Sequence, residues 1–356
     1  MKDSVKAVAL ISGGLDSLLA AKVVQDQGIH VEGLNFYTGF CVEGHTHSIR
    51  QSLRDTRERA GKPPVRNNAL WVAEQLGIKL HIIDVIDDYK DVVLNPKHGY
   101  GQNLNPCVDC KVFMVNRAQT WGFMQDGGFD FVITGEVLGQ RPKSQIRDKL
   151  ELIATESGVD DRLLRPLSAK HLAPTLPERE GWIDRNKLYD FHGRNRKPQI
   201  ALAKSLGFED WAQPAGGCCF LTDPEYANRL SDMWRSRNTR EYSLDDLMLL
   251  KVGRHLRPSP NFKLLIGREA GENNYLEGYK NQFTHLRINS HKGPLTLLDG
   301  TADDNELELA ARIVARYSQG KTADQVEVTV HQTDGVNKVF KVVPLAAYEI
   351  EKRWHV

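Results

Sequence analysis

The sequence has no long apolar run, because its apolar stretches fall well short of the roughly 20 residues that cross a bilayer. Its first residues also lack the basic region, apolar stretch and small-residue cleavage site of a secretory signal. We therefore expect a cytoplasmic protein that makes no contact with a membrane. With 356 residues, 40% of them apolar and 26% charged, the chain is long enough for two or three globular domains.

The chain also lacks an excess of charge of one sign, since 47 Lys and Arg residues face 46 Asp and Glu residues. A net charge of +1 gives no whole-molecule attraction to nucleic acid, and no DNA partner is expected. Phosphate contacts need only a local positive surface, so RNA binding stays open. Arg141, Lys143 and Arg147 could form such a surface, or they could simply solubilise an exposed segment.

Cysteine is scarce, and an odd total of five in a chain expected to be cytoplasmic argues against a disulfide scaffold. Cys107 and Cys110 form a C-x-x-C pair, and Cys218 and Cys219 follow much later. Such thiols could hold structural zinc or an iron–sulfur cluster, or act as a redox pair. Because neighbouring side chains in extended chain point in opposite directions, the late pair is not expected to reach one metal together. Cys41 is expected to be a packed thiol.

The most informative segment that is present is Ser12-Gly13-Gly14-Leu15-Asp16-Ser17. It follows an apolar run over 7–11, which predicts a buried parallel strand, and precedes a helical run over 18–24. Gly13 and Gly14 allow a tight turn with exposed N–H groups, and the helix adds its positive end. Strand, turn and helix together predict a phosphate cradle.

The side chains of this loop suit the same chemistry. Ser12 and Ser17 could donate hydroxyl groups to phosphate oxygens, and Asp16 is the candidate catalytic residue that holds Mg²⁺. The alternative is an ordinary strand-to-helix turn, in which Asp16 or Ser17 caps the helix. The loop lacks the Lys of a Walker A loop and the spacing of a dinucleotide fingerprint, which excludes those two classes of phosphate site.

The pattern Ser-Gly-Gly-x-Asp-Ser resembles the signature of the PP-loop ATP pyrophosphatases. This resemblance implies that Ser12, Gly13, Gly14, Asp16 and Ser17 bind ATP together with Mg²⁺. It also implies that ATP is split between the α and β phosphates and that AMP is transferred to an oxygen of the substrate.

Strands and helices alternate after this loop. Apolar runs over 31–37, 79–85 and 129–135 predict further strands, which indicates an α/β fold with a doubly wound parallel sheet, of the adenine nucleotide alpha hydrolase-like type that the PP-loop resemblance implies. Ligands of such sheets bind at the carboxyl ends of the strands. Gly135 and Gln140 follow a strand on that side, so we expect them to border the nucleotide.

We expect three segments along the chain. Residues 1–165 form the PP-loop ATP-binding domain, and residues 166–240 form a linker and central region that carries the late cysteines. Residues 241–356 form a smaller C-terminal α+β domain, since short strands broken by Gly and Pro accompany a helix over 305–317.

Two further stretches resemble enzymes that thiolate tRNA. Asn105-Pro106-Cys107-x-x-Cys110 is similar to tRNA 2-thiouridylases, and Thr-Gly-Glu-Val-Leu-Gly-Gln over 134–140 resembles 4-thiouridine synthetases. The later Gly217-Cys218-Cys219-Phe220 is similar to the Gly-Cys-Phe element of the 2-thiouridylases, from which its doubled cysteine departs. Both are PP-loop enzymes that activate a uridine carbonyl as its adenylate and replace the oxygen by sulfur. The resemblance implies an ATP-dependent tRNA sulfurtransferase whose partners are tRNA and a sulfur donor, either sulfide or a persulfide carrier.

By the same resemblance, Cys107, Cys110 and one of the late cysteines are the ligands of a 4Fe–4S cluster whose free iron would bind hydrosulfide. Cys219 is preferred over Cys218, because it precedes Phe220 as the family's late cysteine precedes its phenylalanine. In a second mechanism Cys219 carries a persulfide, and Cys107 resolves it as a disulfide without a cluster. The resemblance thus implies that Cys107 and Cys219 are catalytic.

The last third of the chain is similar to the RNA-binding domain of ribosome-quality-control proteins, through Ile266-Gly267-Arg268 and Gly293-Pro294. It does not resemble the β-barrel of the 2-thiouridylases. The early RNA-binding domain of the 4-thiouridine synthetases is missing ahead of the ATP strand.

Two other functions compete with tRNA thiolation. A PP-loop ligase or sulfurtransferase acting on a small molecule would need no cysteine cluster. A non-catalytic, zinc-containing RNA-binding protein would need no intact phosphate loop.

Overall fold

The computed structural model describes residues 5–41, 66–125, 128–211 and 218–356. These residues form two compact units, the first ending at Asp223 and the second beginning at Pro224. The late cysteines therefore lie within the first unit, and residues 224–240 lie within the second. No helix in the described ranges is long and apolar enough to cross a bilayer.

The first unit is built on a five-stranded parallel sheet with the order β3-β2-β1-β4-β5. The strand order reverses between β1 and β4, and open α/β sheets bind their ligands at the carboxyl ends of the strands beside such a switch point. The sequence analysis predicted this doubly wound parallel sheet correctly. The strands are β1 Lys6–Leu10, β2 His30–Tyr37, β3 Leu80–Asp84, β4 Phe131–Ile133 and β5 Leu163–Leu164.

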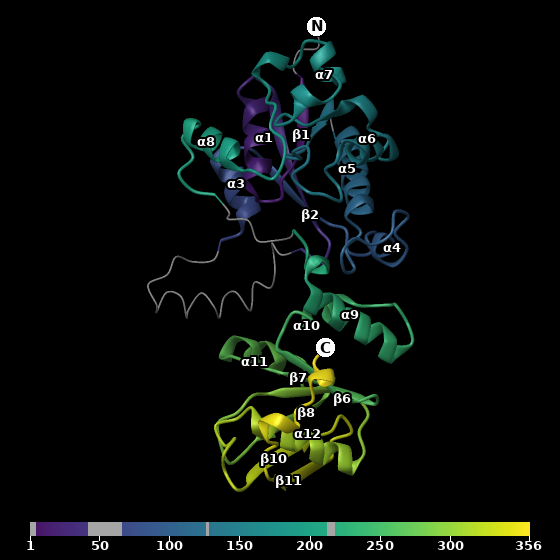
Figure 1. Ribbon diagram of the computed structural model, residues 1–356, viewed down its shortest axis with the longest axis vertical. Helices are drawn as coiled ribbons and strands as arrows, with labels where there is room; N and C mark the ends of the chain where they lie inside the picture. Colours follow the sequence, from purple (N-terminus) through teal and green to yellow (C-terminus); the bar gives the residue numbers. More distant parts are fainter. Residues whose placement is uncertain (1–4, 42–65, 126–127, 212–217) are drawn as a thin grey trace. The chain divides into compact units, whose positions relative to one another are not determined.

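Helices cover both faces of this sheet, with α1, α3 and α8 on one face and α5 and α6 on the other (Figure 1). The main helices are α1 Leu15–Gln25, α3 Asn68–Leu76, α5 Cys107–Met124, α6 Arg147–Glu156 and α8 Lys197–Ser205. The shorter ones are α4 Lys90–Leu94, α7 Leu176–Arg179, and the single turns η1 Asp160–Arg162, η2 Ala169–His171, η3 Arg185–Lys187 and η4 Phe220–Thr222.

The core of the first unit centres on β1. This strand pairs in parallel with β2 on one side and β4 on the other, so both of its faces and both of its edges are covered. Ala7, Val8 and Ala9 are fully buried, which explains why the strand is a continuous apolar run. Leu18 and Leu19 of α1 are buried in the same core and fix the start of α1 above the end of β1.

The second unit is a six-stranded sheet with the order β11-β10-β8-β9-β7-β6, antiparallel throughout. Helix α12 lies against β8, β10 and β11, and its start is fixed by a capping box between Asp303 and Glu306. The strands are β6 Arg254–Ser259, β7 Phe262–Ile266, β8 Thr284–Ile288, β9 Thr296–Gly300, β10 Val326–His331 and β11 Asn337–Val342. The helices are α9 Pro224–Arg237, α10 Leu244–Leu249, α11 Ala270–Glu277, α12 Asp304–Arg316, η5 Ala347–Glu349 and η6 Lys352–Trp354.

Candidate functional site

The loop after β1 has the conformation that a phosphate cradle requires. Gly13 adopts φ +79°, and a Cβ on it would lie 2.8 Å from the backbone N of Ala69, so only glycine fits. Gly14 is the N-cap of α1, and no side chain caps the helix, which leaves the first N–H groups of α1 available. The expectation that Asp16 or Ser17 caps the helix is therefore wrong, because the helix begins earlier than that role requires. Ser17 instead donates its hydroxyl to the Gly14 carbonyl at 2.8 Å.

Asp16 is held by side chains that are far away in the sequence. Gln140 Nε2 donates to Asp16 Oδ2 at 2.7 Å, and Arg196 Nη2 lies 3.5 Å from Asp16 Oδ1. Gln199 Nε2 in turn donates to Gln140 Oε1 at 3.0 Å. The structure thus brings together Asp16 and Gln140, which the sequence selected separately, and adds two residues that sequence reasoning missed.

Two polar atoms of this network are buried without a hydrogen-bond partner in the part of the chain that the structure describes, namely Arg196 Nε and Gln199 Oε1. Buried polar groups are normally paired, so unpaired ones at the carboxyl edge of a sheet are available to a ligand. The basic residues around Arg196, where α8 begins, were a weak sequence signal for that residue, and Gln199 had none.

The segment Thr134–Gln140 packs tightly on the phosphate loop. A Cβ on Gly135 would lie 2.5 Å from the carbonyl carbon of Asp16, so this glycine lets the backbone after β4 touch the first turn of α1. The same segment carries Glu136, which is 1% exposed and pairs with Arg165 at 3.0 Å and Lys111 at 3.9 Å. The sequence analysis did not single out these three charged residues.

Glu136 stays ionised despite its position. Burial opposes the charge, but Lys111 and Arg165 outweigh that effect and lower the pKa of the carboxyl group. Thr134 donates its hydroxyl to the same carboxylate at 3.2 Å. Because Lys111 follows Cys110 in α5, the ion pair joins the segment that contacts Asp16 to the helix that begins with the C-x-x-C pair.

Three chain segments bring the cysteines together. Cys107 and Cys110 lie in the first turn of α5, and Asn103 Nδ2 donates to the carbonyl of Thr222 at 2.9 Å, which ties the preceding loop to the late segment. The backbone at 40–41 runs antiparallel to the backbone at 219–220, with Cys41 opposite Cys219. The expectation of a merely packed Cys41 therefore needs correcting, because this thiol is partly exposed beside the others. Glycines 216 and 217 of the motif lie outside the described residues.

Tyr89 lies among these thiols. Its side chain is 2% exposed, its ring meets that of Phe113 edge-on at 5.5 Å, and its hydroxyl is hydrogen-bonded to Cys110. Burial raises the pKa of Cys110 to about 12, Cys218 adds to this, and the tyrosine bond partly offsets it. Burial likewise raises the pKa of Cys219 well above its usual value.

The pKa of Cys107 is also raised by burial, although Asn105 Nδ2 donates to its sulfur at 3.1 Å and opposes that shift. Thiols of this kind are neutral at neutral pH, so a metal ion would have to displace their protons on binding. In the described ranges no three His, Cys, Asp or Glu side chains are grouped so that they could hold a metal ion. We therefore derive no step through zinc or an iron–sulfur cluster.

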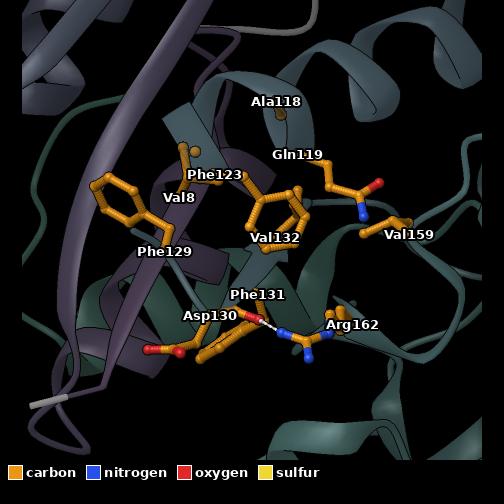
Figure 2. Close-up of a pocket in the computed structure, with 11 residues that line it drawn as sticks. Val8, Ala118, Gln119, Phe123, Phe129, Asp130, Phe131, Val132, Val159 and Arg162 are labelled. Atoms are coloured by element: carbon orange, nitrogen blue, oxygen red, sulfur yellow. Dashed lines mark hydrogen bonds between the residues drawn. The ribbon is translucent and has the colours of Figure 1, made fainter. Parts of the chain in front are cut away.

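A cavity in the first unit lies away from this site. It is enclosed by α5, the middle of β1 and the start of β4, and its lining is largely apolar (Figure 2). Arg162 closes one end by donating to the carbonyl of Asp130 at 3.0 Å. Because β4 and β5 begin there, the cavity is at the amino ends of the strands, and we assign it no chemistry.

In the second unit the two short motifs lie in connections that flank strands. Arg268 forms an ion pair with Glu272 at 2.7 Å, and Glu272 also accepts from the backbone N of Gly253 at 3.1 Å, which fixes the connection between β7 and α11. Gly293 packs so closely on Ile288 that a Cβ would lie 2.5 Å from its Cδ1.

These features define an α/β protein of the PP-loop type with a second, antiparallel α+β unit. Comparison with known families agrees, since residues 5–162 match the tRNA methyl transferase HUP domain and residues 253–355 match the NFACT protein RNA-binding domain. The first unit is thus of the HUP type, and the chain resembles the tRNA thiouridylases.

Curated relatives support this resemblance. The tRNA-specific 2-thiouridylase MnmA of Petrotoga mobilis is 25% identical over 292 residues, which cover 80% of this chain and 71% of the relative. The enzyme of the same name from Sulfurimonas denitrificans is 30% identical over 142 residues, which cover 38% of this chain and 35% of the relative. The chain thus spans only about a third of the length of several curated relatives that it matches.

Solved structures resemble the chain more distantly. A 4-thiouridine synthetase in complex with RNA and bound ATP is 23% identical, with a TM-score of 0.37, over 62% of this chain and 45% of that one.

Proposed function

We propose that the protein is an ATP-dependent tRNA sulfurtransferase that activates a uridine carbonyl as its adenylate and replaces the oxygen by sulfur. The observation that carries the proposal is the segment Thr134–Gln140, which contacts both parts of the chemistry. Gln140 bonds to Asp16 of the phosphate loop, and Glu136 pairs with Lys111 beside Cys110. A reaction that activates an oxygen and then supplies sulfur needs these two groups next to each other.

In the first step the N–H groups of the Ser12–Ser17 turn bind the ATP phosphates at the positive end of α1. Asp16 is the hard oxygen ligand for Mg²⁺, which when bound would neutralise charge on the phosphates. Gly135 and Gln140 border the adenylate, and Arg196 adds a positive charge beside Asp16. The uridine oxygen attacks the α-phosphate, and pyrophosphate leaves with its charge stabilised by the turn.

In the second step the outer sulfur of a Cys219 persulfide, received from a sulfur carrier, replaces AMP on the uridine. A second thiol breaks the sulfur–sulfur bond by forming a disulfide with Cys219, and a dithiol reductant then restores both thiols. Cys107 and Cys110 line the same site. The competing proposal is a 4Fe–4S cluster on Cys107, Cys110 and Cys219 or Cys218. The iron and sulfide content of the purified protein distinguishes the two proposals. Iron and sulfide in near-equal amounts in protein purified without oxygen would favour the cluster, and activity in iron-free protein would exclude it.

The second unit is proposed to hold the tRNA. Its support is the match of residues 253–355 to the NFACT protein RNA-binding domain and the 2-thiouridylase names of the curated relatives. Because the net charge of the whole chain is nearly balanced, tRNA binding would depend on a local positive surface.

Mass spectrometry of tRNA nucleosides from cells with and without the gene tests the proposal. We expect one thiolated uridine to disappear when the gene is removed and to return when it is restored. Unchanged nucleosides, together with pyrophosphate release on a small molecule, would favour a ligase. Tight RNA binding with no pyrophosphate release would favour a non-catalytic RNA-binding protein.

The late cysteines offer a sharper test. Cys219 is half-buried and lies opposite Cys41, whereas Cys218 is exposed. Cys219→Ser should therefore lose sulfur transfer to tRNA more severely than Cys218→Ser, while both variants keep tRNA-dependent pyrophosphate release. Equal loss, or the reverse order, would show that Cys219 is not the sulfur-carrying residue.

A further inference from the structure

Cys41 and Cys219 are directly opposed across two short antiparallel backbone segments. The amide of Phe220 donates to the carbonyl of Phe40 at 2.9 Å, and this bond joins the residue after Cys219 to the residue before Cys41. In an antiparallel ladder that pattern makes Cys41 and Cys219 a non-hydrogen-bonded pair, the kind in which opposed side chains lie closer together.

The backbone spacing of such a pair suits a disulfide. Opposed Cα atoms of a non-hydrogen-bonded pair are about 4.5 Å apart, and disulfides join Cα atoms that are roughly 4.4–6.8 Å apart. Both side chains of an opposed pair leave the backbone on the same face. The two thiols therefore need no backbone movement to form a bond.

The present contacts of Cys41 are easily exchanged. Its sulfur contacts the Thr38 hydroxyl at 3.2 Å and the Phe36 carbonyl at 3.5 Å, and both are weak sulfur bonds that a rotation about χ1 would release. Cys41 is also partly exposed, so a thiol reagent can reach it.

Cys107 is less well placed to be this partner. Its sulfur accepts a hydrogen bond from Asn105, and its thiol neighbour is Cys218. The thiols whose charge raises the pKa of Cys219 are Cys218, Cys110 and Cys41. Of these, Cys110 is already hydrogen-bonded to Tyr89, and Cys218 is the chain neighbour of Cys219. Cys41 is therefore the best-placed partner.

We propose that Cys41 is the resolving thiol of Cys219 and forms a reversible disulfide with it. The role in sulfur delivery rests on the proposed sulfurtransferase function, whereas the pairing of the two thiols does not. A persulfide donor R–S–SH first exchanges with the Cys219 thiol to give Cys219–S–SH and R–SH. Cys41 Sγ then attacks Cys219 Sγ, the bond to the outer sulfur breaks, and the Cys41 proton leaves with that sulfur as H₂S.

This step conserves atoms and electrons. The sulfurs of Cys41 and Cys219 become a disulfide, and the outer sulfur is reduced from the sulfane state to sulfide. A dithiol reductant returns the disulfide to two thiols for the next turnover. The released sulfide is the nucleophile that would displace AMP from the activated uridine.

The test uses the full chain, fully reduced and then freed of reductant, with glutathione persulfide as the probe. We expect about one sulfide released per chain, together with a peptide in which Cys41 is linked to Cys219, as detected by mass spectrometry after alkylation. In Cys41→Ser, sulfide release should fall by about tenfold or more, while an alkylated persulfide accumulates on Cys219. A purely structural role of Cys41 would not produce that accumulation.

Cys107→Ser is the discriminating variant. It keeps the Cys41–Cys219 link if the pairing is right, and it abolishes the link to Cys219 if Cys107 is the partner. Unchanged sulfide release in Cys41→Ser, or a Cys107–Cys219 link in the wild type, would overturn the proposal. Thermal unfolding of Cys41→Ser and Cys41→Ala shows whether either variant is misfolded. Because the assay contains neither ATP nor RNA, failure of the thiolation function leaves its outcome unchanged.

Discussion

At the scale of single residues, the phosphate loop shows how one side chain takes its role from distant partners. Asp16 occupies the first turn of α1 without capping it, and its carboxylate is bonded by a side chain 124 positions away. Gln199 supports that partner and keeps an unpaired oxygen. The carboxylate is therefore oriented before any ligand arrives, which lowers the free-energy cost of binding.

Replacing Asp16 with Ala should abolish tRNA-dependent pyrophosphate release and leave the fold intact. Because α1 has no side-chain cap to lose, we expect a change of about 1.5–3 kcal/mol in the free energy of unfolding, the size of a hydrogen bond to a charged group. Pyrophosphate release and denaturant unfolding measure the two effects.

Asp26→Ala is the matched control for Asp16→Ala. Asp26 is the C-cap of the same helix, and among the described residues its carboxylate pairs with Lys22 four positions earlier, so its loss should leave turnover unchanged. If Asp16→Ala retained normal turnover, Asp16 would have no place in the mechanism.

The sequence predicted those site residues whose role depends on a local motif. Ser12–Ser17, Gln140 and the C-x-x-C pair all lie in short motifs. Arg196 and Gln199 could not be found in this way, because only the packing of α8 beside α1 brings them to Asp16. Cys41 was assigned to packing for the same reason, since its partner lies across a bridge between chain segments far apart in sequence.

At the scale of elements, the segment between β4 and α6 links the phosphate loop to helix α5. Glu136 is bonded to Arg165, which follows β5 and also donates to the carbonyl of Leu150 in α6 at 2.9 Å. Lys111 approaches the same carboxylate from α5. One buried carboxylate thus fixes the positions of three elements around the loop.

Glu136→Gln should destabilise the first unit strongly. Removing one partner of a buried ion pair leaves Arg165 uncompensated at 6% exposure, which typically costs about 3–5 kcal/mol. Urea unfolding followed by tryptophan fluorescence measures this loss. Glu156→Gln is the control, because that glutamate pairs with Lys97 and His98 at the surface.

The same carboxylate predicts a pH dependence. Its pKa in the folded protein is below its ordinary value of 4.5, so the unfolded chain takes up a proton first as the pH falls. The stabilisation is complete above pH 4.5 and is lost as the pH falls through the lower folded value. The wild type should lose this part of its stability in acid, and Glu136→Gln should not. Parallel pH profiles of the two proteins would contradict the assignment.

At the scale of the whole molecule, the chain joins a unit that matches a HUP domain to a unit that matches an RNA-binding domain. The division between parallel and antiparallel sheets was predictable, because it follows from the spacing of apolar runs. The boundary at Asp223 was not, because the late cysteines pack on the first unit through contacts such as that of Asn103 with Thr222.

A chain that ends at Asp223 should keep ATP binding and lose tRNA affinity by about tenfold or more at moderate salt, since phosphate contacts dominate such affinity. Filter binding of tRNA at several salt concentrations, with ATP binding measured beside it, gives both results. We expect the slope of log affinity against log salt to become shallower. Equal affinity in the short and full chains would place the RNA surface in the first unit instead.

The position of β1 in the sheet has a consequence for synthesis on the ribosome. The amide of Lys6 bonds to the side chain of Asp130, 124 positions later, and β4 covers that edge of β1. At about 5–20 residues per second, the edge stays open for roughly 6–25 s after β1 has been made. An open edge of a strand this apolar is a template for pairing with other chains. Strand β1 is thus translated well before β4 encloses it, and the nascent first unit is prone to aggregate in that interval.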